Sequence, residues 1–194
     1  MVMKIGVLAL QGAISEHLTI LSQIGVEPIP VKYAQQLDLL DGLIIPGGES
    51  TAINQLITEN QLYQPIRHFA LKGKAIFGTC AGLIMCATTI MDNNQTNQRI
   101  KPLSLLEITV KRNAFGRQLE SFETTLDIKD IGQDVPAVFI RAPYIQSVSP
   151  NVEVLAKFDG NIVMAKQGSI LVSSFHPELT NDIRILRYFK TLVK

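Results

Sequence analysis

The chain contains few of the side chains that bind metals or form disulfides. Its 194 residues include only two cysteines and three histidines, and the histidines are widely separated. A structural metal site needs a cluster of such ligands, so we expect no metal. Cys80 and Cys86 would lie about a turn and a half apart on one helix, so we also expect no disulfide.

The sequence also has little net charge and no long apolar run. Its formal charge is +1 and it has no basic stretch, which argues against nucleic acid or an anionic membrane as a partner. No apolar run approaches the roughly 18 residues of a membrane span. Residues 1–7 lead directly into an expected strand and lack the parts of a signal peptide. We therefore expect a cytoplasmic protein.

The alternation of apolar segments predicts an α/β fold in a single domain, residues 1–194. The length and the hydrophobic content of 46% suit one substantial core. Short β–α repeats with nearly continuous apolar strands predict three layers, a mostly parallel central sheet with helices on both faces. We expect strands at 4–10, 27–31, 41–45 and 74–77, and helices at 13–24, 49–58 and 62–71.

Beyond residue 105 the pattern changes to a succession of strands. We expect these strands to extend the same sheet, and we expect residues 92–99, which are polar and lack periodicity, to form a loop. Turns are expected at 113–116 and 159–161. The expected strands are 106–111, 118–128, 135–140, 152–158, 162–166 and 170–175, and a final helix is expected at 181–192.

A cysteine framed by two glycines gives the strongest chemical signal. In Phe77-Gly78-Thr79-Cys80-Ala81-Gly82 the cysteine follows an apolar strand and precedes an apolar, helix-like run that begins at Leu83. Glycines at −2 and +2 permit a tight strand-to-helix elbow that presents a nucleophile. The helix N-terminus favours the thiolate. We therefore expect Cys80 to be a nucleophile, whereas Cys86 lacks the glycine frame and is expected to be a buried structural residue.

The sequence Phe175-His176-Pro177-Glu178 supplies a base and a residue to orient it. Pro177 disfavours helix at His176, so we expect an extended stretch in which His176 and Glu178 point to the same side. A cysteine, a histidine and a glutamate make a nucleophile, a base and an orienting group. We expect His17 to face solvent or a partner and His68 to lie on the surface of a helix.

Two further segments end expected strands. Gly47 and Gly48 follow a strand and allow backbone N–H groups to approach a ligand, so Gly48 together with the N–H of Ala81 is expected to form an oxyanion hole. The Gly-Lys-Ser/Thr pattern of a phosphate-binding loop is missing here, which argues against nucleotide binding. Arg141 follows an apolar strand, which places it at the same kind of strand-end site.

These motifs together resemble those of class I glutamine amidotransferases. Within that group, nearly the whole chain resembles the family of glutaminase subunits of ribose-5-phosphate-dependent pyridoxal 5′-phosphate synthases. The similar segments occur in the family's order, at residues 8–12, 46–51, 77–82, 112–118, 139–143 and 174–179. Tyr144 departs from the histidine that the family often has, and residues 92–104 match no known motif. The resemblance implies the flavodoxin-like fold of this superfamily.

The resemblance also implies an activity. Cys80 would attack the side-chain amide of L-glutamine, release ammonia and form a γ-glutamyl thioester that water hydrolyses, with His176 moving protons and Glu178 holding its ring. Ammonia would pass to a separate synthase subunit in a hetero-oligomeric complex, and no cofactor is implied on this chain. Gln11 is implied near the oxyanion, and the residues implied to bind glutamine are Gly48, Glu49, Ser50, Arg112, Ile140 and Arg141.

Three other hypotheses remain at this point. A glutaminase could feed a different acceptor, such as a histidine- or purine-pathway synthase. A cysteine peptidase or hydrolase could use the same elbow. A binding subunit could keep the fold without catalysis. The intact Cys80, His176 and Glu178 argue against the last, and activity on peptides rather than glutamine would favour the second.

Overall fold

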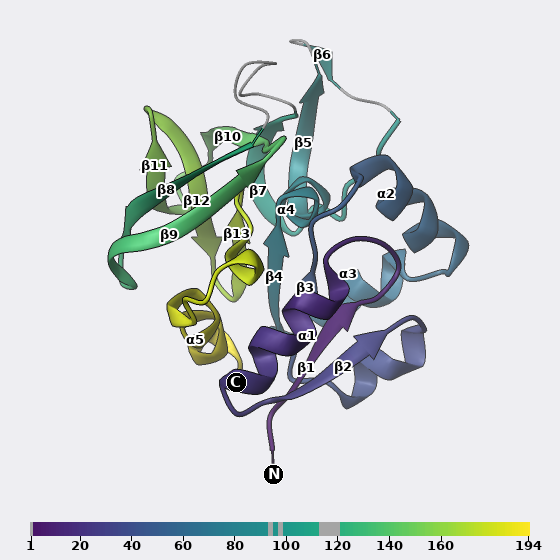
Figure 1. The fold of residues 1–194 in the computed structure, drawn as a ribbon. Helices are drawn as coiled ribbons and strands as arrows, with labels where there is room; N and C mark the ends of the chain where they lie inside the picture. The colour runs from purple at the N-terminus through teal and green to yellow at the C-terminus, as the bar shows by residue number, and fades with distance from the viewer. Residues whose placement is uncertain (1, 93–94, 97–98, 113–120) are drawn as a thin grey trace.

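A computed structural model describes residues 2–92, 95–96, 99–112 and 121–194. In this part of the chain an eleven-stranded sheet forms the centre of the molecule (Figure 1). The expected turn at 113–116 and the first residues of the strand expected at 118–128 lie outside the described residues. Five adjacent strands are parallel, in the order β2 (Glu27–Val31), β1 (Lys4–Leu8), β3 (Gly42–Ile45), β4 (Ala75–Thr79) and β13 (Ile170–Ser173).

Mainly antiparallel strands continue the sheet beyond β13. Their order is β12 (Asn161–Gln167), β10 (Tyr144–Val148), β7 (Leu106–Lys111), β5 (Ala87–Asp92) and β6 (Gln95–Thr96), and β11 (Glu153–Phe158) also pairs with β12. Strands β5 and β10 are not expected from the sequence, and β6 lies inside the expected 92–99 loop. The apolar run around β5 has no period that separates helix from strand, and its β-branched Thr88, Thr89 and Ile90 favour the strand.

Two of the later strands leave the main sheet. Strands β8 (Ser121–Ile128) and β9 (Gly132–Ile140) form their own antiparallel pair, so the expectation that all later strands extend one sheet is wrong. Phe122 stacks on Phe139 with ring centroids 4.7 Å apart, and Phe139 in turn packs on Phe175 at 5.5 Å. Phe139 and Phe175 are buried against the main sheet and Phe122 is partly buried there, so the pair crosses the face of the sheet instead of joining its edge (Figure 1).

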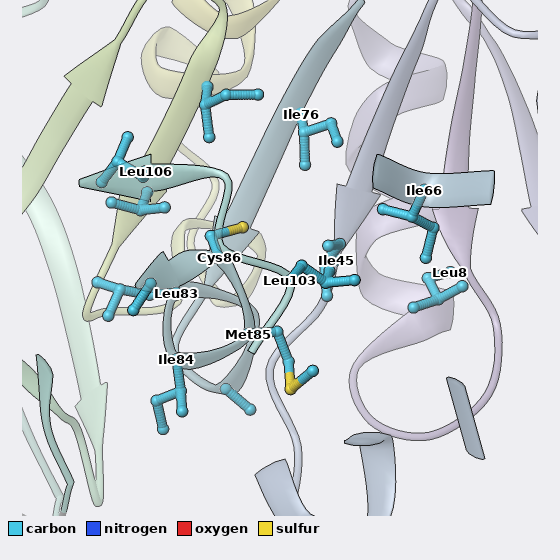
Figure 2. Packing of buried hydrophobic residues seen from close by; sticks show 14 of the residues in the cluster. Leu8, Ile45, Ile66, Ile76, Leu83, Ile84, Met85, Cys86, Leu103 and Leu106 are labelled. Atoms are coloured by element: carbon cyan, nitrogen blue, oxygen red, sulfur yellow. The ribbon is translucent and has the colours of Figure 1, made fainter. Parts of the chain in front are cut away.

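Helices cover both faces of the sheet. On one face α1 (Ile14–Gln23), α5 (Arg184–Leu192) and the β8–β9 pair bury their apolar side chains. On the other face lie α2 (Ser50–Glu59), α3 (Tyr63–Leu71), α4 (Ala81–Cys86) and the 3-10 turn η1 (Ala34–Leu39). Figure 2 shows Leu83, Met85 and Cys86 of α4 among apolar side chains of β3, β4 and β7. The expected three-layer α/β arrangement is therefore present.

The topology brings three loops to one edge of the sheet. The parallel strands β3, β4 and β13 are neighbours, and Ser173 at the end of β13 pairs with Thr79 at the end of β4. The loops that follow these strands contain Gly47, Cys80 and His176. Carboxyl ends of parallel strands are the usual place for a site in such sheets. Among the described residues, none of the helices is long and apolar enough to cross a membrane.

Candidate active site

Cys80 lies on a strained elbow between β4 and α4. Its backbone φ of 50° and ψ of −102° are values that residues other than glycine rarely adopt. Strained backbone of this kind is typical of a nucleophile elbow. A Cβ at Gly78 would lie 2.5 Å from the Gly82 carbonyl oxygen, and a Cβ at Gly82 would lie 1.9 Å from that of Ile45. Both glycines are therefore required, as the sequence predicts. The Cys80 N–H donates to the Ser173 carbonyl at 2.8 Å, which ties the elbow to β13.

His176 and Glu178 form a buried hydrogen-bonded pair. Glu178 Oε1 lies 2.7 Å from His176 Nδ1, and both residues are only 6% exposed. The local backbone differs from the expectation, because residues Pro177–Leu179 form a 3-10 turn (η3) where an extended stretch is expected. Proline suits the first position of such a turn, and the turn brings the two side chains together. The His176 N–H also donates to the Val138 carbonyl at 2.8 Å, which fixes the loop on β9.

The electrostatics of the pair favour a protonated imidazole. Burial alone would lower the pKa of His176, but hydrogen bonds to Cys80 and Glu178 raise it to about 10. Burial alone would likewise raise the pKa of Glu178, but the neighbouring imidazoles of His17 and His176 hold it below its usual value. Since Glu178 occupies Nδ1, Nε2 remains for the thiol of Cys80. A protonated ring at this position can pass its proton to a leaving group, which is the task of a general acid.

A cavity of about 600 Å³ opens in front of the thiol. Its volume is in the range of small-molecule sites. The structure brings every residue that the resemblance implies for glutamine into this one cavity, and it adds Ile84 and Ser121, which the sequence does not predict. The lining residues are Gly48, Glu49, Ser50, Cys80, Ala81, Ile84, Arg112, Ser121, Ile140, Arg141 and His176.

The loop expected to bind the oxyanion is held by neighbouring elements. The Gly47 N–H donates to Thr79 Oγ1 at 3.1 Å, and the Gly47 carbonyl accepts from the Ala13 N–H at 3.2 Å. Because the peptide bond is trans, the Gly48 N–H points away from Ala13. A Cβ at Gly47 would lie 2.3 Å from His176 Cε1, so only glycine lets the loop approach the imidazole this closely.

Gln11 contacts the same loop from the end of β1. Its Oε1 accepts from the Glu49 N–H at 2.9 Å, and a Cβ at Gly48 would lie 2.3 Å from this oxygen. Gln11 is not among the residues that line the cavity, although it packs directly behind Gly48. It therefore supports the loop, and a direct contact with an oxyanion stays a prediction.

Glu49 and Arg112 face each other across the cavity wall. Glu49 caps α2, since its carboxylate accepts from the N–H groups of Thr51 and Ala52 at 2.9 and 2.7 Å. Burial slightly opposes ionisation, but these hydrogen bonds and the Arg112 guanidinium hold the pKa of Glu49 below its usual value. Arg112 Nη2 lies 3.8 Å from Glu49 Oε1, and its Nη1 lies 3.5 Å from Asp92 Oδ2.

The end of β9 forms another wall. The Cys80 thiol donates to the Ile140 carbonyl at 3.8 Å, and the Ile140 side chain is exposed for an apolar residue at 38%. Arg141 follows with a φ of 44° and is exposed. An arginine in the left-handed region carries backbone strain, and such strain is concentrated at functional sites. Arg112 and Arg141 thus present two guanidinium groups to one cavity.

His17 is not on the surface, so that expectation is wrong. Its side chain is fully buried, with Nε2 3.3 Å from Thr79 Oγ1 and 3.4 Å from Glu178 Oε2. The sequence carries a signal for this position. His17 shares a face of α1 with Ile20 and Leu21, which are three and four residues further on and are also buried. His68 lies exposed on α3, as expected.

The two cysteines have different surroundings. Both are free, and Cys86 lies fully buried in the core shown in Figure 2. Burial raises the pKa of the Cys86 thiol to about 12, which leaves it unreactive near neutral pH. Cys80 alone of the two lines the cavity. Within the described ranges, no group of three or more His, Cys, Asp or Glu side chains is arranged to hold a metal ion.

Comparison with known proteins gives concordant results. The model of the SNO glutamine amidotransferase family matches residues 7–194. A protein of Oceanobacillus iheyensis named pyridoxal 5′-phosphate synthase subunit PdxT is 54% identical over 190 residues, covering 98% of this chain and 93% of that protein. A protein of the same name from Carboxydothermus hydrogenoformans is 53% identical and covers 96% of each chain.

Solved structures share the fold. A structure described as a glutamine amidotransferase superposes with a TM-score of 0.90 at 45% identity, covering 97% of this chain and 98% of that one. The structure of PurLQS from Thermotoga maritima superposes with a TM-score of 0.75 at 15% identity, covering all of both chains. The second likeness, at this low identity, concerns the fold alone.

Proposed function

The chain belongs to the SNO glutamine amidotransferase family, and from that premise we propose that it hydrolyses L-glutamine to L-glutamate and ammonia at Cys80. The observation that carries this proposal is the buried Glu178–His176 hydrogen bond of 2.7 Å behind a cysteine on a glycine-framed elbow. We assign the whole of residues 1–194 to one catalytic domain. We also propose that it acts in the cytoplasm and needs no cofactor of its own.

The first chemical step forms a thioester. The Cys80 thiolate attacks the carbonyl carbon of the glutamine side chain, and the negative charge moves to the amide oxygen. The N–H groups of Gly48 and Ala81 would stabilise that oxyanion. His176, whose pKa is raised to about 10, then gives its proton to the amide nitrogen, so the carbon–nitrogen bond breaks and ammonia leaves.

The second step hydrolyses the thioester. His176 is now neutral and takes a proton from water, which attacks the same carbon. The carbon–sulfur bond breaks, and the thiolate of Cys80 and the protonated ring of His176 are restored with the release of glutamate. Glu178 stays ionised in both steps, because its pKa is held below its usual value, and it holds Nδ1 so that Nε2 faces the reacting atoms.

The cavity offers complementary charges to an amino acid. Arg112 and Arg141 suit the α-carboxylate, Glu49 suits the α-ammonium group, and Ser50 can hydrogen-bond to either. Glu49 is already fixed by its cap on α2, so its carboxylate is pre-oriented for a ligand. These assignments explain why charged residues from three separate segments converge on one cavity.

Removing either arginine is expected to weaken glutamine binding and leave the fold unchanged. Arg112→Ala and Arg141→Ala each lose a cationic partner of the bound carboxylate, which is worth about 1.5–3 kcal/mol and is expected mostly in KM. Steady-state kinetics at varied glutamine measure the effect, and thermal melting checks the fold. Lys72→Ala, at the C-terminal end of α3, is a control that should leave KM unchanged. An unchanged KM in both arginine variants would contradict the assignment.

The partner we propose is a pyridoxal 5′-phosphate synthase subunit that receives the ammonia. The relatives that carry this name match nearly the whole chain, and ammonia is of use to the cell only where an acceptor is present. The Gly47–Gly48 peptide offers a means of control. Since both residues are glycines, rotating this peptide by half a turn costs little in backbone strain. The rotation would break the hydrogen bond from the Ala13 N–H to the Gly47 carbonyl and would exchange the Gly48 N–H for that carbonyl.

Adding the synthase subunit is therefore expected to raise the glutaminase rate of the purified chain. The loss of one oxyanion donor costs roughly 10²–10³ in kcat, so a free chain with the peptide rotated away would be nearly inactive. Ammonia release at saturating glutamine, with and without the synthase subunit, measures the increase. Equal rates would rule out the switch, and cleavage of peptides with no action on glutamine would contradict the proposed function itself.

A further inference from the structure

His17 is a buried polar residue to which the reaction as described gives no role. Its side chain has no solvent exposure, and burial lowers its pKa. The apolar neighbours on its face of α1, Ile20 and Leu21, pack into the core. An apolar side chain at position 17 would pack there without the cost of burying an imidazole. The polar contacts of the ring therefore need an explanation.

The polar contacts of the His17 ring are with Glu178 and with Thr79. His17 Nε2 lies 3.4 Å from Glu178 Oε2, the carboxylate oxygen that does not bond to His176. Among the described residues neither this oxygen nor His17 Nδ1 has a hydrogen-bond partner, and the 3.4 Å contact with His17 Nε2 brings a possible donor to Oε2. His17 Nε2 also lies 3.3 Å from Thr79 Oγ1, which accepts the N–H of Gly47.

The geometry assigns the tautomer of the ring. A proton on Nε2 faces a carboxylate oxygen and a hydroxyl oxygen, whereas a proton on Nδ1 would have no acceptor and would leave the Nε2 lone pair against the carboxylate. The charged and titratable groups that face His17 are Glu178, His176 and Glu16. Glu178 favours the Nε2–H form, and His176 opposes a second positive charge on the ring.

We propose that His17 is a positioning residue for glutamine hydrolysis: its Nε2–H fixes the second oxygen of Glu178 and, through Thr79, steadies Gly47, the residue before Gly48. This inference rests on the proposed function. Glu178 is then held at both oxygens, Oε1 by His176 and Oε2 by His17, so it cannot rotate away from the base. Helix α1 is thereby a structural part of the active site although it contributes nothing to the cavity wall.

Two matched substitutions test the role. His17→Gln keeps an N–H donor on an unbranched side chain, and His17→Met has a similar length and removes the donor. Measured in the complex with the synthase subunit, His17→Met is expected to lower kcat about 10- to 100-fold, the effect of losing one hydrogen bond to a buried charge. KM for glutamine should hardly change, since His17 does not line the cavity. His17→Gln is expected to recover most of kcat.

The pH profile separates positioning from a packing role. Without the donor, the carboxyl group of Glu178 takes up a proton more readily, so the acid limb of kcat should move to higher pH in His17→Met and stay in place in His17→Gln. A packing role predicts that both variants lose activity together with stability and that neither limb moves. An unshifted limb in a folded His17→Met protein would overturn the proposal.

Two further measurements do not depend on glutamine turnover. The rate at which iodoacetamide alkylates Cys80 near neutral pH should fall in His17→Met, because weaker support from Glu178 reduces the thiolate–imidazolium pair. This result stands even if glutamine proves not to be the substrate. In the unmodified chain, nitrogen-15 NMR should show His17 neutral with its proton on Nε2. A proton on Nδ1, or a charged ring at neutral pH, would overturn the proposal without any variant.

Discussion

Replacing Cys80 with alanine is expected to abolish ammonia release from glutamine while the fold stays intact. Sγ is the atom that forms the thioester, and no other thiol lines the cavity in the described part of the chain. Loss of the nucleophile from a comparable triad costs about 10⁶ in kcat, so turnover should fall below detection. Alanine retains the Cβ of cysteine and therefore meets the same strain at a φ of 50°. A coupled ammonia assay and a thermal melt measure both effects.

Cys86→Ala is the matched control for this prediction. Cys86 lies six residues from Cys80, is fully buried and has a pKa raised to about 12, so the variant should keep most of the activity. In the unmodified chain, iodoacetamide should label Cys80 and leave Cys86 untouched, which peptide mass spectrometry can resolve. Near-normal turnover by a folded Cys80→Ala protein would disprove the assignment of the nucleophile.

Replacing His176 with asparagine should be comparably severe. The asparagine amide can still reach Glu178 in place of Nδ1, but nothing remains at the position of Nε2 to carry a proton to ammonia or from water. The loss should appear in kcat and persist at saturating glutamine. Alkylation of Cys80 should also slow near neutral pH, because the imidazolium that stabilises the thiolate is gone. Rapid turnover in this variant would require another proton carrier in the cavity.

Replacing Glu178 with glutamine should have a milder effect than replacing His176. The substitution keeps a group that can bond to His176 Nδ1 and removes the charge, so the fall in kcat should be smaller, about 10²–10⁴. The pKa of His176 should drop from about 10 because part of its stabilisation comes from this carboxylate. As the pH rises, the effect of the His176 ring on the rate of Cys80 alkylation should therefore disappear at a lower pH in Glu178→Gln than in the unmodified chain. A loss as complete as that of Cys80→Ala would mean that Glu178 does more than orient the base.

Local sequence signals predicted the chemical core of the site because each depends on a few adjacent residues. The glycines around Cys80 are required because a Cβ at either position would lie 2.5 Å or less from a backbone carbonyl oxygen. His176 and Glu178 are two positions apart, and the short turn there brings their side chains within 2.7 Å although the sequence predicts an extended stretch. The parallel half of the sheet also followed from its apolar strands. In these places short-range sterics determine the structure.

Local sequence patterns did not predict the structure where contacts between distant parts of the chain determine it. The apolar run after Cys80 has no period that separates helix from strand, and pairing with β7 stabilises its second half as β5. Strand β9 could have joined the main sheet, but its aromatic contacts with Phe175 place it across the face. His17 follows the charged Glu16 on the first helix, which predicts a position facing solvent or a partner, whereas the residue is buried. Its polar contacts are with Thr79 and Glu178, which are distant in the sequence.

The order of strands has a consequence for the synthesis of the protein. Strand β13, which leads to His176, is inserted between β4 and β12, and it is the last strand of the described chain to be made. A nascent polypeptide therefore carries its thiol long before it carries the base, and the central sheet can close only after β13 emerges from the ribosome. Pairing over such a sequence separation is slow, so completion of the sheet should limit the rate of folding. Incomplete chains are consequently unable to consume glutamine.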